Sequence, residues 1–286
     1  MFKCIKIIRC IFSIEAGIFN QSEEHMPINS VTIVFITGAF VSHLSWKPWM
    51  EYFQAKGFNC IAPPWPYKEG KPEELRKDEN AKSKIASLRF NKLVDYFEDI
   101  VSKLPEKPVV IGHSIGGLIV QILVNRDLVR AGIAIHSVPP QGVFSLEWPL
   151  IKSMWKPLGI FTASKKTYLM SFKEWQYAFT NDMPEEEQFA AYEKYILPES
   201  KKLLRDTLTY ASKIDFQKTH PPLLFIAGGN DNLVTSTLNY NNYAKYNKEH
   251  SVTDYKEFKD KNHFITGHLL WEDEAQYILS WLEVLP

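Results

Sequence analysis

The most constraining segment of this 286-residue chain is 107–124, where a short apolar run leads at once into a glycine-flanked serine and a second apolar run. The residues at 109–111 are typical of a short buried parallel strand, and those at 118–123 follow the spacing of a helix that packs back on a sheet. Between them, Gly112 and Gly116 flank Ser114 in a Gly-x-Ser-x-Gly pattern. So sharp a turn strains the backbone of its central residue, so its neighbours must be small. The segment therefore predicts a strand-to-helix turn that presents Ser114 as a nucleophile.

Short apolar runs alternate with helical patterns over much of the chain. The predicted strands span 31–36, 58–62, 109–111, 132–136, 223–227 and 252–258. Strands that alternate with helices are joined by right-handed crossovers and form a mostly parallel sheet. Residues 85–104 carry apolar side chains at helical spacing and are predicted to cover this sheet, after a charge-dense segment, 68–84, that we expect to be a solvated loop and helix start. The pattern predicts an α/β fold with a mostly parallel central sheet flanked by helices.

The strand pattern stops between residues 139 and 216, where the chain is rich in aromatic residues at helical spacing. Asn181 or Asp182 can cap a helix that has Pro184 in its first turn. We interpret 139–216 as a helical lid inserted into a core made of 26–138 and 217–286. Its aromatic residues either line a substrate pocket or simply bury the lid against the core.

The first 25 residues are predicted to form a separate N-terminal extension. Lys3, Lys6 and Arg9 are scattered among its apolar residues, and its longest uncharged piece, 10–14, is too short for a secretory signal or a membrane span. We expect an extension or an extra strand here, with an exported form as the alternative and Met26 as an alternative start.

Composition excludes several classes of function. Lysine plus arginine and aspartate plus glutamate number 33 each, so the formal net charge is zero and no basic field attracts nucleic-acid phosphates. The cysteines, Cys4, Cys10 and Cys60, are too few for a disulfide framework and lack metal-ligand spacing. We therefore predict a cytoplasmic protein without a metal, a nucleic-acid partner or a membrane span, and the sequence gives no indication of its oligomeric state.

A serine hydroxyl needs a base to take its proton and a carboxylate to orient that base. His263 lies just past the last predicted strand, where a loop at the carboxyl edge of the sheet can reach Ser114. Asp231 follows a buried strand and two glycines, which allow a tight turn on a rigid support. The predicted catalytic residues are therefore Ser114, Asp231 and His263.

Several residues are rivals for these roles. His268 is the alternative base, and Asp215 and Asp260 are weaker candidates for the acid. His113 is next to Ser114 but points away from it in the geometry of such a turn, and His136 is expected to end a strand.

Acyl transfer also needs hydrogen-bond donors for the oxyanion. One is the backbone N–H of Ile115, which follows the nucleophile, and the second comes from the turn at 37–40, with Ala39 preferred and Phe40 in reserve. The alternative for 37–40 is a plain strand-to-loop turn. The residues suggested as walls of a substrate pocket are Phe40, His113, Trp155, Trp175 and Phe179.

Over about residues 27–286 the chain resembles the α/β-hydrolase superfamily. The resemblance rests on Gly-His-Ser-Ile-Gly-Gly, Gly-Gly-Asn-Asp-Asn-Leu-Val, Asn-His-Phe and the Gly-Ala-Phe turn. It implies the chain order nucleophile, acid, base, and a helical lid inserted after the sixth strand of the sheet. One departure is Thr37, which stands where the family commonly has histidine before the glycine, although the backbone donors of the turn are retained.

The resemblance further implies a serine hydrolase that cleaves a small or medium uncharged carboxylic ester, or a related thioester or lactone, through an acyl-enzyme and without a cofactor. A serine nucleophile, rather than aspartate, argues against dehalogenase and epoxide hydrolase chemistry. Because one fold hosts many functions, two alternatives stay open. One is a ligand-binding, receptor-like module, and the other is a carbon–carbon or cyanohydrin lyase that uses the same residues.

Overall fold

The computed structural model describes residues 31–159, 162–163 and 165–285. The predicted N-terminal extension of residues 1–25 and the alternative start at Met26 lie outside this range. No helix of the described part is both long and apolar enough to cross a bilayer.

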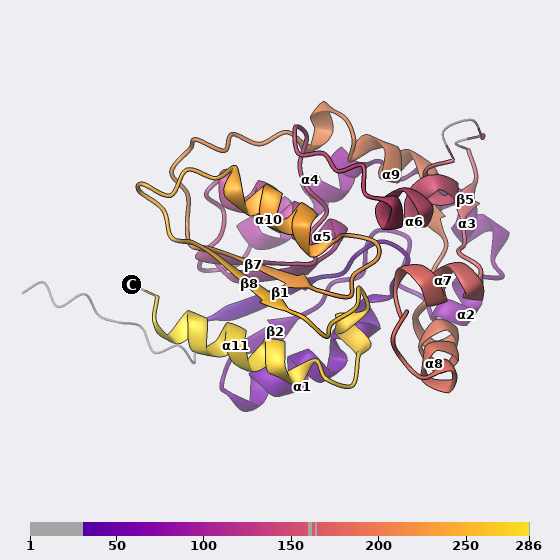
Figure 1. Cartoon of the computed structure of the whole chain (residues 1–286), viewed down its shortest axis with the longest axis horizontal. Helices are drawn as coiled ribbons and strands as arrows, with labels where there is room; N and C mark the ends of the chain where they lie inside the picture. The colour runs from indigo at the N-terminus through magenta and orange to yellow at the C-terminus, as the bar shows by residue number, and fades with distance from the viewer. Residues whose placement is uncertain (1–30, 160–161, 164, 286) are drawn as a thin grey trace, which may run out of the picture.

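A parallel six-stranded sheet forms the centre of the molecule (Figure 1). Its strands, in chain order, are β1 (Thr32–Ile36), β2 (Asn59–Ile61), β3 (Val109–His113), β4 (Ala131–Ile135), β7 (Leu223–Gly228) and β8 (Thr253–Phe258). Their order across the sheet is β2-β1-β3-β4-β7-β8. Every residue of β3, β4 and β7 is buried, as expected of parallel strands covered on both faces. Each predicted strand falls on one of these six, and the predicted fold class is confirmed.

Helices cover both faces of the sheet. One face packs against α1 (Lys47–Ala55) and α11 (Glu272–Glu283), and the other packs against α4 (Phe90–Ser102), α5 (Ile115–Asn125) and α10 (Ser236–Ala244) (Figure 1). The shorter elements of the core are η2 (His43–Trp46), α2 (Pro72–Leu75), α3 (Glu79–Ser87) and η4 (Ile265–Gly267).

The single helix predicted over 85–104 is interrupted. Leu88 and Arg89 are extended, so α3 ends before them and α4 begins after them. The cause is tertiary, because Asp206 accepts two hydrogen bonds from the Arg89 guanidinium, at 2.6 and 2.7 Å, and a third at 3.1 Å from the backbone N–H of Phe90. A residue far along the chain therefore sets where α4 starts.

The segment 139–216, which we name the insertion, contains a helical array and a small antiparallel ribbon. Its elements are α6 (Trp148–Leu158), β5 (Thr167–Tyr168), α7 (Phe172–Ala178), α8 (Glu185–Tyr195), β6 (Glu199–Ser200), α9 (Lys201–Asp206) and η3 (Tyr210–Ser212). In the described sheet the insertion follows β4, the fourth strand along the chain, and not the sixth as the family resemblance implied.

Helix α8 starts differently from the predicted cap. Its N-cap is Pro184 itself, in an extended conformation, and not Asn181 or Asp182. Both of these side chains have other partners, because the Asn181 amide donates to the carbonyl of Asn230 and the Asp182 carboxylate accepts from Asn230 and Asn262. These contacts tie the insertion to the loops that follow β7 and β8.

The Asp206 contact provides a test of how the insertion stabilises α4. We expect Asp206→Ala to lower the free energy of unfolding by about 2–3 kcal/mol, since it removes charge-assisted bonds to Arg89 and the acceptor for Phe90. Urea unfolding followed by circular dichroism measures this change. Asp95→Ala, which breaks an exposed pair with Lys92, is the control and should change stability by no more than about 0.5 kcal/mol. Equal stabilities of the two variants would contradict the role given to Asp206.

Candidate active site

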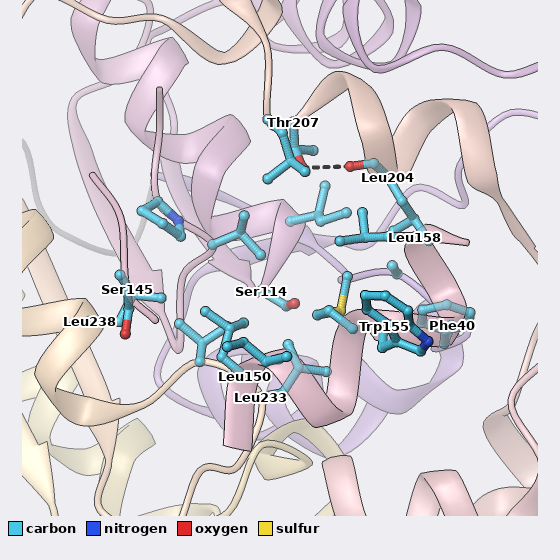
Figure 2. A pocket seen from close by; sticks show the side chains of 18 of the residues that line it. Phe40, Ser114, Ser145, Leu150, Trp155, Leu158, Leu204, Thr207, Leu233 and Leu238 are labelled. Atoms are coloured by element: carbon cyan, nitrogen blue, oxygen red, sulfur yellow. Dashed lines mark hydrogen bonds between the residues drawn. The ribbon is translucent and has the colours of Figure 1, made fainter. Parts of the chain in front are cut away.

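Ser114 occupies the turn between β3 and α5 in a strained conformation. Its φ is 58° and its ψ is −118°, a region that residues with side chains rarely adopt. The flanking glycines make the turn possible, since a Cβ at Gly112 would overlap the backbone of Gly116, and a Cβ at Gly116 would overlap the backbone of Ile36. The strain turns the Ser114 side chain into a cavity, where Figure 2 shows its hydroxyl.

Asp231 and His263 are brought together by the loops that follow β7 and β8. The Nδ1 of His263 lies 2.7 Å from Oδ2 of Asp231, and both side chains are fully buried. The other oxygen of Asp231, Oδ1, accepts from the backbone N–H groups of Leu233 and Val234 at 2.7 and 2.8 Å. Although burial alone would raise the pKa of Asp231, His263 and a second histidine, His136, lower it, so the carboxylate is ionised.

The ring of His263 lies beside the turn that carries Ser114. Its centroid is 4.7 Å from that of His113 and 4.9 Å from that of Phe179, which lines the same cavity as Ser114. With Nδ1 facing Asp231, Nε2 is the nitrogen left for a proton from Ser114, and it has no hydrogen-bond partner among the described residues. A Ser114–His263 hydrogen bond is thus not formed here, and the catalytic triad stays a prediction. Such contacts often tighten only when substrate binds.

His113, suggested as a pocket wall, does not line the cavity. Its side chain is fully buried, and Nε2 lies 2.7 Å from the backbone carbonyl of His263. A carbonyl only accepts, so this nitrogen carries the proton. Burial, together with the neighbouring histidines, lowers the pKa of His113 well below its ordinary value, and the ring is neutral. His113 therefore holds the loop of His263 instead of contacting a ligand.

Two backbone N–H groups next to Ser114 are the predicted donors to an oxyanion. Ile115 is the first residue of α5, so its N–H has no partner within the helix. In the turn after β1, the N–H of Phe40 donates to Oε2 of Glu199 at 3.2 Å, whereas that of Ala39 has no acceptor among the described residues. Ala39 and Ile115 both line the cavity next to Ser114. The geometry favours Ala39 over Phe40 as the second donor.

A buried ion pair from the insertion holds this turn. Glu199 accepts from Phe40 and from Nζ of Lys68 at 2.5 Å, and both charged side chains are at most 2% exposed. Backbone bonds between the turn and residues 195–197 add to this contact. The expectation of a solvated 68–84 segment was therefore wrong for Lys68, whose partner lies 131 residues away and could not be found from local sequence.

A cavity of about 650 Å³ opens in front of Ser114 (Figure 2). Its wall is mostly apolar and comes from α6, α9, α10 and the loop after β7, with Leu150, Leu158, Leu204, Leu233 and Leu238 among its residues. Of the suggested walls, Phe40, Trp155 and Phe179 line it. Trp175 does not, because it is fully buried behind Phe179 and stacks on that ring at 4.5 Å.

Residues 33–278 match the family model described as the alpha/beta hydrolase family. The chain belongs to this family. The predicted resemblance is therefore confirmed. No match was found among the sequences of curated proteins.

Solved structures of other α/β hydrolases share the fold at low sequence identity. A methylesterase from Arabidopsis is 16% identical with a TM-score of 0.63, and the match covers 89% of this chain and 100% of that one. A variant of tomato methylketone synthase I with bound β-ketoheptanoate is 14% identical with a TM-score of 0.63, covering 89% and 98%. A monoacylglycerol lipase from Paleococcus ferrophilus is 18% identical with a TM-score of 0.62, covering 88% and 93%. At these identities the likeness shows the fold alone.

The alternative candidates for the base and the acid in this α/β hydrolase have other surroundings. Nδ1 of His268 accepts from the backbone N–H of Leu270, and Asp215 and Asp260 are exposed. His136, expected only to end a strand, does follow β4 but also contacts Asp231, with Nδ1 3.4 Å from Oδ2. No local pattern marks His136 as part of the site.

Ring nitrogens of His113, His136 and His263 lie within 4.8 Å of one another, a spacing that could in principle hold a metal ion. Their other contacts point to a different arrangement. His136 and His263 both face the Asp231 carboxylate, and His113 donates to a carbonyl. Two of the three rings are therefore organised around Asp231 and the third around a backbone carbonyl, and no metal step enters the chemistry below.

The Lys68–Glu199 pair provides a stability test of the turn at Ala39. We expect Glu199→Gln to lower the free energy of unfolding by about 3–5 kcal/mol, since it leaves the Lys68 ammonium buried without a counter-charge. Glu193→Gln, which breaks the more exposed pair with Arg76, should cost no more than about 1 kcal/mol in the same urea titration. The double variant Lys68→Met/Glu199→Leu should recover part of the loss, since it removes both buried charges but also the acceptor of the Phe40 N–H. A Glu199→Gln protein as stable as the control would contradict this assignment.

Proposed function

We propose that this α/β hydrolase is a serine hydrolase of carboxylic esters with an apolar acyl or alcohol part. The observation that carries the proposal is the buried 2.7 Å contact by which Asp231 orients His263 beside the strained Ser114 turn. A carboxylate that fixes one ring nitrogen leaves the other as a base, which is the requirement for activating a serine hydroxyl.

In the proposed reaction, Nε2 of His263 takes the Ser114 proton while Oγ attacks the ester carbonyl carbon. The carbonyl oxygen becomes an oxyanion and accepts from the N–H groups of Ile115 and Ala39, and Asp231 stabilises the imidazolium. The imidazolium then gives its proton to the leaving alcohol as the carbon–oxygen bond breaks. Water, deprotonated by His263, then attacks the acyl carbon. As the bond to Ser114 Oγ breaks, the imidazolium returns the proton to Oγ, which releases the acid and restores Ser114.

The cavity supports an apolar substrate. Its volume of about 650 Å³ lies within the usual range for small-molecule pockets, and its wall is mostly apolar, although Lys156 and Lys201 are also among the lining residues. The structural neighbours named as a methylesterase and a monoacylglycerol lipase are consistent with ester chemistry on this fold. The receptor-like module and the lyase remain the alternatives to be separated by experiment.

Removal of the nucleophile is the first test. Ser114→Ala should lower turnover of a short p-nitrophenyl ester by about a millionfold and abolish labelling by a fluorophosphonate probe. Ser145→Ala is the matched control, because Ser145 lines the same cavity but lies outside the proposed triad, and it should be labelled like the wild type. A wild-type protein that binds an ester but neither cleaves it nor reacts with the probe would favour the receptor-like module.

The wall at Leu150 provides a test of substrate class. Leu150→Trp should shorten the cavity, so kcat/KM for an octanoyl ester should fall by about 10- to 100-fold while that for an acetyl ester stays within about threefold. Leu169→Trp, outside the cavity wall, is the control and should leave the ratio of the two esters unchanged. A parallel loss on both esters would show that the acyl chain does not occupy this cavity.

A further inference from the structure

A second histidine and a glutamate extend the Asp231–His263 pair away from Ser114. Nδ1 of His136 lies 3.4 Å from Oδ2 of Asp231, and Nε2 of the same ring lies 3.7 Å from Oε1 of Glu274 on α11. All four side chains, His263, Asp231, His136 and Glu274, are fully buried. His136 and Glu274, which the proposed reaction does not use, thus extend a chain of contacts that starts at its acid, Asp231.

The backbone is shaped around the His136 ring. His136 has a φ of +46°, which is uncommon for a residue with a side chain, and its N–H donates to the carbonyl of Ile226 at 2.8 Å. Gly228, which ends β7, leaves space for the ring, because a Cβ there would lie 2.8 Å from Cε1 of His136. The positive φ of His136 and the missing side chain of Gly228 together allow this ring to lie between the carboxylates of Asp231 and Glu274.

Burial leaves these groups dependent on one another. Neither the carboxylate of Glu274 nor the ring nitrogens of His136 have a hydrogen-bond partner among the described residues, and a buried ionised carboxylate without a partner is strongly disfavoured. The place of Glu274 in the first turn of α11 supplies only the partial positive charge of the helix end. The facing ring of His136 is the side chain placed to supply a full charge.

His136 is placed to carry that charge at neutral pH. Burial disfavours the charged ring, but the contacts with Asp231 and Glu274 outweigh it and raise the pKa of His136 to about 9. The other titratable rings nearby do not compete for the charge, since burial is the main cause that lowers the pKa of both His113 and His268. Lys261, in the loop before His263, is paired with Asp273 at 3.1 Å.

Asp231 links His136 to the proposed base. The rings of His136 and His263 share one acceptor, because both face Oδ2 of Asp231, at 3.4 and 2.7 Å. The other oxygen, Oδ1, is held by the backbone N–H groups of Leu233 and Val234. A change in the position of His136 therefore reaches the orientation of His263 through a single buried carboxylate.

We propose that His136 and Glu274 are positioning residues for the Ser114 reaction, in which Glu274 holds the His136 ring against Asp231 and thereby fixes the carboxylate that orients His263. The inference rests on the proposed function, because it concerns the base of that reaction. Neither residue touches the substrate, since both lie behind Asp231 and outside the cavity wall.

The test is the kinetics of Glu274→Gln, which keeps the shape of the side chain and removes its charge. With a short p-nitrophenyl ester, we expect kcat to fall about tenfold while KM stays within about twofold, because the base is less well oriented and the cavity is untouched. Glu272→Gln is the matched control, since Glu272 lies in the same first turn of α11 but is exposed. It should leave both quantities unchanged.

Two readouts guard against a purely structural effect. Titration with the fluorophosphonate probe counts the competent sites, so kcat is expressed per site, and KM does not depend on how much protein is folded. A kcat per site of Glu274→Gln equal to that of Glu272→Gln would overturn the inference. Failure of the proposed function would be recognised separately, because Ser114→Ala would then retain activity.

Discussion

The close approach of α5 to the carboxyl ends of β1 and β3 is the constraint on which the rest of this site depends. Helix α5 can begin so near the sheet only because Gly112 and Gly116 have no side chains where the neighbouring backbone passes. That approach strains Ser114, directs its side chain into the cavity, and brings the free N–H of Ile115 near the turn that holds Ala39. The proposed nucleophile and the proposed oxyanion donors are thus positioned by one packing contact.

The insertion is part of the site and does more than cover it. Its helix α6 forms one wall of the cavity, and residues 195–199 hold the turn after β1 through backbone bonds and the Glu199 carboxylate. Apolar residues of the insertion, among them Trp175 and Leu203, belong to the same hydrophobic cluster as the helices on that face of the sheet. A change in the insertion therefore reaches the turn at residues 37–40 through buried, closely packed contacts.

Asp231 contacts both histidines, His263 and His136, through one carboxylate. One of its oxygens is held by two backbone N–H groups, and the other faces both His263 and His136. Because these groups are buried, each charge depends on its neighbours, and the ionised state of Asp231 is maintained by two rings that come from different loops. Asp231 therefore both orients His263, the proposed base, and contributes the negative charge next to it.

The sequence alone determined the six strands, the strained turn at Ser114, and the placement of Asp231 and His263 on loops after successive strands, because periodicity and turn sterics are properties of neighbouring residues. Tertiary structure decided the rest. It ended α3 at Leu88 through Asp206, buried Lys68 against Glu199, and placed His136 between Asp231 and Glu274. Each of these contacts joins residues from distant parts of the chain, and the free energy that holds a buried charge exists only once its partner has been brought to it.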